Sequence, residues 1–227
     1  MNASCANVRR ARPLLGTLVE IRAAAGGERA LRAIDRAFVA IERVHHAMSA
    51  QESTSDIARL RAGRWAGLDP WTRRVLDRAE EVRSATDGLF DCAACRHSLD
   101  GIAKGFAVDR AVEILQEADI AGGAVNAGGD LRLFGAELQD VYVRTPHAPA
   151  DLQCIGRVRD AAVATSASVL LVAPRGAHLR AGLRAATIIA ADCMTADALT
   201  KPCLLEPERA RELAARFAAH ALVFAEQ

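Results

Sequence analysis

The sequence lacks the features that would assign it to a membrane or a nucleic acid. No segment approaches the roughly eighteen uninterrupted apolar residues of a membrane span, and residues 1–12 contain no apolar core of a signal peptide. Charge of one sign is also missing, because 29 basic residues face 28 acidic ones and the formal net charge is +1. We therefore expect a cytoplasmic protein that binds no nucleic acid, does not insert into membranes and keeps its six cysteines reduced.

Lysine is almost absent. Of the 29 basic residues only Lys104 and Lys201 are lysines, and all the others are arginines. A chain that prefers arginine is expected to keep lysine where a compact ammonium on a flexible stem is needed. Lys104 lies in a glycine-rich loop, and Lys201 follows the carboxylate of Asp197. Both lysines therefore mark candidate functional positions.

Strand and helix patterns alternate irregularly along the 227 residues. Apolar periodicity predicts helices at 30–48, 71–86, 106–117 and 208–220, a capped turn at 55–60 and a helix entered through a loop at 192–205. Strands are predicted at 13–21, 131–134, 141–143, 169–173, 186–190 and 221–224, with 131–134 paired to 141–143 and a hydroxyl-rich turn at 164–167. This order favours an α+β fold with a mixed sheet and flanking helices over a doubly wound fold.

One stretch has the pattern of a ligand site. Ser98–Asp109 is typical of a glycine-bearing loop that opens a helix, and Val125–Asp130 of a strand ending in a second glycine turn and a carboxylate. The N–H groups at a helix start are unpaired and partly positive, so such a loop suits a phosphate. Glycines in the second turn would let the backbone approach a ligand closely. The alternatives are a phosphate or nucleotide site and a plain helix joined to a hairpin.

Two further patterns each have a functional and a structural interpretation. Cys92-Ala-Ala-Cys95 can be a redox dithiol or half of a zinc site, but no second pair with suitable spacing follows. Small buried cysteines are therefore the favoured interpretation. His45 and His46 end a predicted helix, where surface histidines are favoured over metal ligands.

With these segments in view, the chain resembles the FAD:protein FMN transferases, the ApbE-type flavin transferase family. The matching pieces occur in the family's order along most of the chain: Leu15-Gly16-Thr17, Met48-Ser49 with Ser55 and Leu60, Thr86–Asp91, Gly101–Asp109, Val125–Asp130, Ala162–Ser166 and Met194–Leu199. The resemblance implies one ApbE-like domain over residues 1–227. Its cleft would be formed by segments near 48–55, 86–130, 162–168 and 192–201.

The resemblance also implies a reaction. Family members cleave the pyrophosphate of FAD, join the FMN half to a serine or threonine hydroxyl of an acceptor protein, and release AMP. Such flavinylation implies a transferase with FAD as substrate and Mg²⁺ as cofactor, because a divalent cation offsets the charge of the pyrophosphate. The implied partners are FAD and an acceptor protein with a Ser/Thr flavinylation site.

Carried over position by position, the resemblance implies roles for individual residues. Lys104 would lie beside the FAD and take part in catalysis, and His178 is the candidate counterpart of the family's base. The Gly101 carbonyl, the Asp197 carboxylate and Thr200 would hold the metal. The cofactor cleft would be lined by Met48, Ser49, Phe90, Asp91, Ser98, Lys104, Asn126, Gly128, Gly129, Asp130, Thr165 and Ser166.

Several positions depart from the family pattern. Ser98 stands where a carboxylate is usual, although Asp100 is close by, and Ala167 replaces a glycine. The segment Cys92–His97 is shorter than its counterpart. A block with a histidine, an Asp-Pro pair and a glycine turn is missing, and only His178-Leu-Arg-Ala-Gly182 stands there.

Lys201 occupies the position of the second side-chain metal ligand, which is a threonine in the family. Either the adjacent Thr200 serves instead, or the Lys201 ammonium pairs with Asp197 or a phosphate and takes the charge role of the cation. The departures leave two main hypotheses open: a working FMN transferase of a shortened type, and a flavin-binding protein that does not transfer the flavin.

Overall fold

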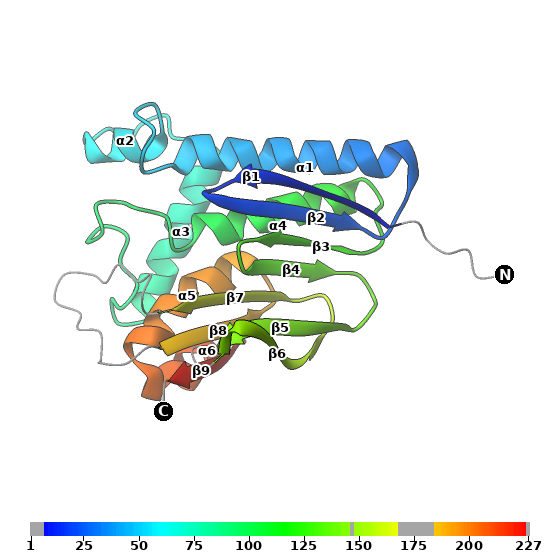
Figure 1. Ribbon diagram of the computed structural model, residues 1–227. Coiled ribbons are helices and arrows are strands. Elements are labelled where there is room, and N and C mark those ends of the chain that lie inside the picture. Colours follow the sequence, from blue (N-terminus) through cyan, green and yellow to red (C-terminus); the bar gives the residue numbers. More distant parts are fainter. Residues whose placement is uncertain (1–6, 146–147, 168–183, 226–227) are drawn as a thin grey trace.

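The computed structural model describes residues 7–145, 148–167 and 184–225. The strands are β1 (Val8–Leu14), β2 (Thr17–Ala23), β3 (Gly123–Ala127), β4 (Asp130–Phe134), β5 (Gln139–Thr145), β6 (Ala148–Val158), β7 (Ala162–Ala167), β8 (Arg184–Ala190) and β9 (His220–Ala225). The helices are α1 (Gly27–Met48), α2 (Asp56–Arg61), α3 (Pro70–Ala85), α4 (Ala103–Glu117), α5 (Cys193–Leu205) and α6 (Ala210–Ala215), with a 3-10 turn η2 (Pro207–Arg209). A seven-stranded sheet has the order β1-β2-β3-β4-β7-β8-β9, and β5 and β6 form a separate two-stranded sheet (Figure 1).

The seven-stranded sheet has a hydrophobic core on each face. Successive side chains of a strand point to opposite sides, so Ala164 and Ile188 pack into the larger core with α1, α4 and α5. Val163 and Ile189, their neighbours along β7 and β8, belong to the smaller core that β5 and β6 close from the other side. Helices therefore cover one face of the sheet and a hairpin covers the other.

The helices begin and pack as their sequences predict. On α1 the residues Ile34, Phe38 and Ile41 recur at helical spacing and are fully buried. Ser55 caps α2 by accepting a hydrogen bond from the Ala58 N–H at 3.1 Å. Pro70 occupies the first turn of α3, where its missing N–H costs no helical hydrogen bond.

The expected α+β class with flanking helices is confirmed. The sheet differs from the predicted mixed sheet in the direction of its strands. Every strand pair in the described ranges is antiparallel, so the sheet is not mixed. The prediction of one strand at 13–21 was wrong, because Leu15 and Gly16 both have positive φ and form a two-residue turn between β1 and β2.

Two other expectations about strands were wrong. Residues 164–167 continue β7 instead of forming a turn. Strand β4 pairs with β3 and β7, whereas β5 pairs with β6, so 131–134 and 141–143 are not partners. The helix predicted at 208–220 ends early, since η2 and α6 are followed by β9. The strand predicted at 169–173 lies outside the described residues.

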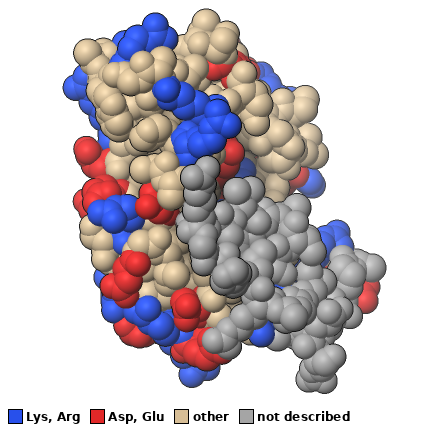
Figure 2. Space-filling view, turned by 90° about the vertical axis from the view of Figure 1, so that its left-hand side faces the viewer, with Lys and Arg blue, Asp and Glu red and all other residues tan. Residues whose placement is uncertain are grey.

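Acidic and basic side chains are interspersed on the surface (Figure 2). On α3, for example, Arg78 pairs with Glu81 at 2.6 Å and Arg83 with Glu80 at 2.7 Å. Exposed pairs of this kind add little stability. The Arg83 side chain is 43% exposed and solvated, whereas Arg78 is only 27% exposed and also reaches the buried Thr195. Among the described helices, none is long and apolar enough to cross a membrane.

Candidate functional site

The candidate site lies where the start of α4 faces the start of β4. Asp130 and Arg132 point to the helix side of β4, while Leu131 and Leu133 point to the smaller core. Lys104, in the first turn of α4, has its Nζ 2.8 Å from Asp130 Oδ2. Only 4% of the Asp130 side chain is exposed, against 31% of the Lys104 side chain. A buried carboxylate is thus paired with an ammonium that reaches the surface.

The turn between β3 and β4 delivers Asp130 to this position. Gly128 has a φ of +63°, which L side chains rarely adopt, and a Cβ on it would lie 2.4 Å from the Thr17 hydroxyl. Gly129 also has positive φ, and its N–H donates to Asn126 Oδ1 at 3.0 Å. The glycines are therefore required by a tight turn packed against β2.

A second ion pair lies on α5, beside α4. Lys201 Nζ is 2.7 Å from Asp197 Oδ1, and the other carboxylate oxygen accepts a hydrogen bond from the Gly105 N–H at 3.2 Å. A Cβ on Gly105 would lie 2.2 Å from the Cys193 carbonyl oxygen, so glycine is needed for the two helices to approach this closely. The Asp197 side chain is 2% exposed and that of Lys201 22%.

Lys104, Asp130, Asp197 and Lys201 form what we call the lysine–aspartate cluster. Burial by itself would lower the pKa of Lys104, but the carboxylates of Asp130 and Asp197 raise it above its ordinary value, so the ammonium is retained. Burial, with the nearby charge of Asp197, raises the pKa of Asp130. The cluster contains both lysines of the chain, and its formal charges cancel. Lys104 and Asp197 thus belong to one group of interacting charges.

Two further carboxylates fix the start of α5. Asp192 accepts a hydrogen bond from the Thr195 N–H at 2.7 Å, and Asp109 of α4 accepts from the Cys193 and Met194 N–H groups at 2.8 Å each. Burial raises the pKa of Asp109 to about 7, although these two backbone hydrogen bonds favour its charged form. The position of Asp197 is therefore set by contacts between α4 and the first turn of α5.

Hydroxyl groups lie beside the cluster at the end of β7. Thr200 is fully buried, and its hydroxyl donates to the Asp197 carbonyl at 2.7 Å and lies 3.0 Å from Ser166 Oγ. Thr165 points to the opposite face of the sheet, where its hydroxyl is 2.9 Å from that of Thr187. The structure therefore brings Ser166 to the cluster and directs Thr165 away from it.

The segment after α3 packs against Lys201. Phe90 is buried, and a Cβ on Gly101 would lie 3.3 Å from the Phe90 ring and 3.0 Å from Lys201 Cε. Gly101 thus leaves room for the aliphatic stem of Lys201 beside the aromatic ring. This contact joins the predicted residues Phe90 and Gly101 to the lysine–aspartate cluster.

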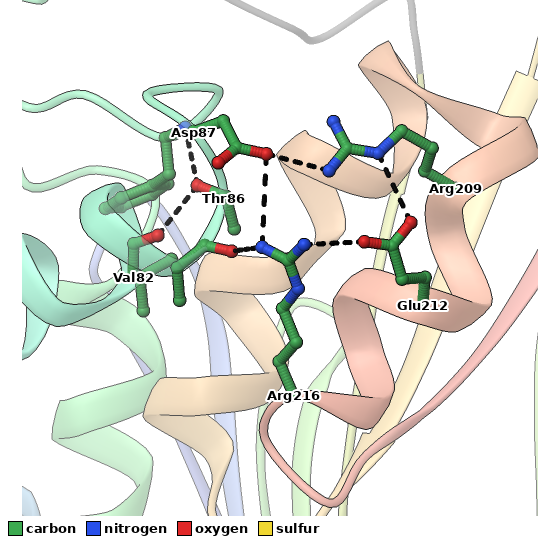
Figure 3. A network of polar contacts seen from close by, with 8 residues as sticks. Val82, Thr86, Asp87, Arg209, Glu212 and Arg216 are labelled. Carbon is green, nitrogen blue, oxygen red and sulfur yellow. Dashed lines mark hydrogen bonds and ion pairs between the residues drawn. The ribbon is translucent and has the colours of Figure 1, made fainter.

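Polar contacts hold this segment at the end of α3 (Figure 3). The Thr86 hydroxyl donates to the Val82 carbonyl at 2.7 Å and accepts from the Phe90 N–H at 3.3 Å. Asp87 accepts a hydrogen bond from Arg209 at 2.7 Å, and Arg216 lies 3.9 Å away. The threonine and aspartate of the Thr86–Asp91 motif therefore have a local structural function.

The sequence profile of the ApbE family matches residues 15–97 and 93–224, which together span most of the chain. The chain belongs to the ApbE family. No curated protein sequence matches it.

Solved structures of ApbE proteins have the same fold. The flavin transferase ApbE from Vibrio cholerae is similar with a TM-score of 0.80 and 18% identity over 98% of this chain and 94% of that one. The ApbE protein of Thermotoga maritima has a TM-score of 0.81 and 21% identity over 97% and 94%. The flavinyl transferase ApbE from Pseudomonas stutzeri, in its apo form, has a TM-score of 0.79 and 15% identity over 98% and 92%. The predicted ApbE-like fold is thus confirmed.

Within the described residues, several other predicted site residues of this ApbE-family chain make only local side-chain hydrogen bonds. Ser49 bonds with Gln51, Asp91 with the Ala94 N–H, and Ser98 with Asp100. The Asn126 bond to Gly129 is equally local, and Met48 is buried at the end of α1. These contacts do not join them to the cluster. His178, the predicted base, lies outside the described residues.

The cysteine pair has the properties of structural thiols. Cys92 and Cys95 are free, and burial raises the pKa of Cys92 to about 12. A reactive cysteine instead needs a lowered pKa. No group of three or more His, Cys, Asp or Glu side chains suited to a metal occurs in the described part of the chain. His46 pairs with Glu52 at 3.0 Å and is exposed, as a helix-end histidine should be.

A surface groove between α3 and α4 contains none of the predicted residues. Arginines and acids line it together, among them Arg74, Arg78, Glu81 and Glu113. Arg78 also donates to the Thr195 hydroxyl at 2.7 Å. The mixed lining gives the groove no preference for ligands of one charge, and the lysine–aspartate cluster remains the candidate site.

Sequence reasoning assigned no role to Asp192 and Asp109 or to the close helix contact at Gly105. Asp192 could have been found, because an aspartate three residues before Thr195 is a common helix-start pattern. The role of Asp109 depends on α5 lying next to α4, far away in sequence. No local pattern reports such a contact.

Proposed function

We propose that this ApbE-family chain is an FAD:protein FMN transferase. The observation that carries the proposal is the lysine–aspartate cluster, which gathers both lysines of the chain at the start of α4 beside a glycine turn. An ammonium and the N–H groups of a helix start both favour a phosphate. Membership of the family supplies the second support.

The FAD diphosphate would lie against Lys104 and Lys201, whose partly exposed side chains can donate to its oxygens. Phe90 would offer an apolar surface, and Ser166 a hydroxyl, to the rest of the cofactor. Gly128 and Gly129 would let the turn approach the ligand. Met48, Ser49, Asp91, Ser98, Asn126 and Thr165 remain proposed cleft residues on the resemblance alone.

In the proposed reaction the hydroxyl oxygen of an acceptor serine or threonine attacks the phosphorus of the FMN half. A new O–P bond forms, the bridging P–O bond to the adenylate half breaks, and AMP leaves with the bridging oxygen. The hydroxyl proton passes to a base, for which His178 is the candidate. Lys104 would stabilise the charge that develops on the diphosphate.

The magnesium ion that the resemblance implies does not fit the residues as they are arranged. One oxygen of Asp197 is bonded to Lys201 and the other to the Gly105 N–H. Thr200 is fully buried, with its hydroxyl bonded inside the protein. Mg²⁺ needs oxygen ligands at about 2.0–2.1 Å in near-octahedral geometry, and these groups are already engaged. In this arrangement these residues do not form a magnesium site.

The test is a transfer assay on the whole chain with FAD and several candidate acceptor proteins, with and without Mg²⁺. We expect a covalent FMN adduct on a serine or threonine, detected by mass spectrometry, together with AMP. The variant Lys104→Met should lose both products, whereas Arg157→Gln, which removes an exposed charge on β6, should retain them. FAD that stays intact with every acceptor would overturn the proposal.

A second candidate function is flavin binding without transfer. It is favoured by Lys201, which stands where the family has a metal ligand and is bonded to Asp197. Titration with FAD separates the two functions, because a binding protein would take up FAD without AMP appearing. Turnover of FAD would exclude this alternative.

A further inference from the structure

We infer that the Lys201 ammonium is the resident cation of this site, so that the chain handles its anionic ligand without a divalent metal. The inference deepens the proposed function and rests on it for the identity of the ligand. It starts from the disagreement between the implied magnesium site and the residues present.

The Lys201 ammonium lies against the oxygens of Asp197. Lys201 Nζ lies 2.7 Å from Asp197 Oδ1 and 3.3 Å from the Asp197 carbonyl oxygen. These are oxygens that a cation beside Asp197 would bind. Gly101, whose carbonyl is another predicted ligand, lies next to the Lys201 stem, since a Cβ on it would come within 3.0 Å of Lys201 Cε. The ammonium thus occupies the position beside the Asp197 oxygens that a metal ion would need.

Packing around the stem of Lys201 holds the ammonium in this position. The Lys201 stem runs beside Gly101, where an added Cβ would approach its Cδ and Cε to 3.4 and 3.0 Å and the Phe90 ring to 3.3 Å. Only 22% of the side chain is exposed. A lysine held along its stem loses little further freedom on binding a ligand, which favours a built-in charge over a loosely placed one.

The positive and negative charges of the cluster are balanced. Asp130 is paired with Lys104, and Asp197 with Lys201, so the two carboxylates already neutralise two ammonium groups. A divalent ion entering the cluster would find both carboxylates already paired and would be repelled by the ammoniums in a partly buried setting, where repulsion is poorly screened. An anionic diphosphate could accept hydrogen bonds from both ammoniums, because the lysine side chains are partly exposed while the two carboxylates are buried.

An ammonium in place of a metal ion changes the chemistry that the site can supply. An ammonium neutralises and orients a phosphate through its N–H donors, but it cannot act as a Lewis acid with open coordination positions. Lys201 would therefore hold the ligand without the polarising effect of a metal. Its effect should appear in ligand affinity in the absence of metal.

The decisive experiment measures Mn²⁺ binding to the whole chain without any flavin, by electron paramagnetic resonance. The wild type should bind no stoichiometric Mn²⁺. Lys201→Thr, which removes the ammonium and places a hydroxyl one turn after Asp197, should gain a site that Asp197→Asn abolishes in the double variant. Lys201→Met, without an oxygen ligand, and Arg157→Thr on β6 should gain none.

Stoichiometric Mn²⁺ binding by the wild type that Asp197→Asn removes would overturn the inference. This arm needs only the wild type and Asp197→Asn, so it stays decisive if Lys201→Thr proves unfolded by circular dichroism. It is also independent of flavin, so its failure is distinct from failure of the proposed function.

A second arm uses FAD as the probe. The wild type should bind FAD equally well with Mg²⁺ and with a chelator, because its cation is covalently attached. Lys201→Met should bind roughly tenfold to a hundredfold more weakly, the usual effect of losing a hydrogen bond to a charged group. A wild-type affinity that collapses on adding the chelator would contradict the inference.

Discussion

Two groups of charged side chains in this protein have similar distances and different surroundings. In the lysine–aspartate cluster the carboxylates are 4% and 2% exposed. The network of Asp87, Arg209, Glu212 and Arg216 in Figure 3 has distances of 2.7 Å and above between Asp87 and its arginines, but the Asp87 side chain is 60% exposed. Contact distance therefore does not separate the two groups, and burial does.

The difference in burial changes the pKa of the carboxylates in opposite directions. Burial raises the pKa of Asp130, whereas a hydrogen bond from Arg209 lowers the pKa of the exposed Asp87. Water already solvates the surface charges, so their pairing changes little. In the cluster each charge depends on its partner, because water cannot replace it. A site that must bind an anion benefits from charges held in this way.

We expect the largest effect on stability from Asp130→Ala, which removes one partner of the buried Lys104–Asp130 pair. Removing Asp130 leaves the Lys104 ammonium with Asp197 as its nearby carboxylate, and we expect a loss of about 3 kcal/mol in the free energy of unfolding, the lower end for a broken buried pair because Lys104 is 31% exposed. Urea unfolding measures the loss directly. Asp130→Asn, which keeps the shape and one acceptor oxygen, should lose less. Equal and small effects of the two substitutions would mean that Lys104 is well solvated without Asp130.

The second prediction concerns pH and the buried Asp109, which lies on α4 beside the cluster. Its pKa is raised from 3.8 to about 7, so its contribution to stability is fully present below about pH 4 and is lost as pH rises through 7. The shift corresponds to at most about 4 kcal/mol. Asp192 on α5 favours the neutral form, and Arg132 on β4 the charged form.

The measurement is the free energy of unfolding between pH 5 and 8 for the wild type and Asp109→Asn. The wild type should lose stability relative to the variant as pH rises, and the comparison cancels the parallel contribution of Asp130. Parallel pH profiles would show that Asp109 is charged throughout this range in the folded protein.

The third prediction tests the approach of α4 to α5. Gly105→Ala places a Cβ 2.2 Å from the Cys193 carbonyl oxygen, which belongs to the backbone and cannot rotate away. The helices must separate, and overpacking of this kind costs about 1–3 kcal/mol. Affinity for FAD should fall too, since the Gly105 N–H holds Asp197. As a control, Gly63→Ala meets open space but keeps its positive φ, so it should affect stability without affecting FAD binding.

Much of this site could be predicted from the sequence. The lysine scarcity singled out Lys104 and Lys201, and both lie in the cluster. The glycine turn before Asp130 was predicted because a tight turn requires residues that tolerate positive φ. Local signals of this kind are carried by single residue types, so they can be read without the fold.

The remaining features depend on contacts between distant segments. Thr165 and Ser166 are adjacent in sequence, and they face opposite sides of the sheet because both belong to strand β7, which the sequence did not predict. The prediction that residues 131–134 pair with 141–143 failed for the same reason. Strand β4 pairs with β7, which is distant in the sequence, and no local pattern indicates that pairing. Asp109 likewise became significant only through α5.

The smallest effect is expected from Asp87→Asn in the exposed network. Asparagine tolerates the left-handed conformation that Asp87 adopts at φ 54°, so the substitution removes the charge without straining the turn. Thermal unfolding should change by little more than the error of the measurement, and raising the salt concentration should reduce the difference further. FAD binding should be unchanged, because the Thr86 hydroxyl still holds the Phe90 N–H. A large loss of thermal stability that does not depend on salt would show that this exposed network positions the Phe90 segment. Burial would then no longer separate the charges of the binding site from the charges that only hold the surrounding structure in place.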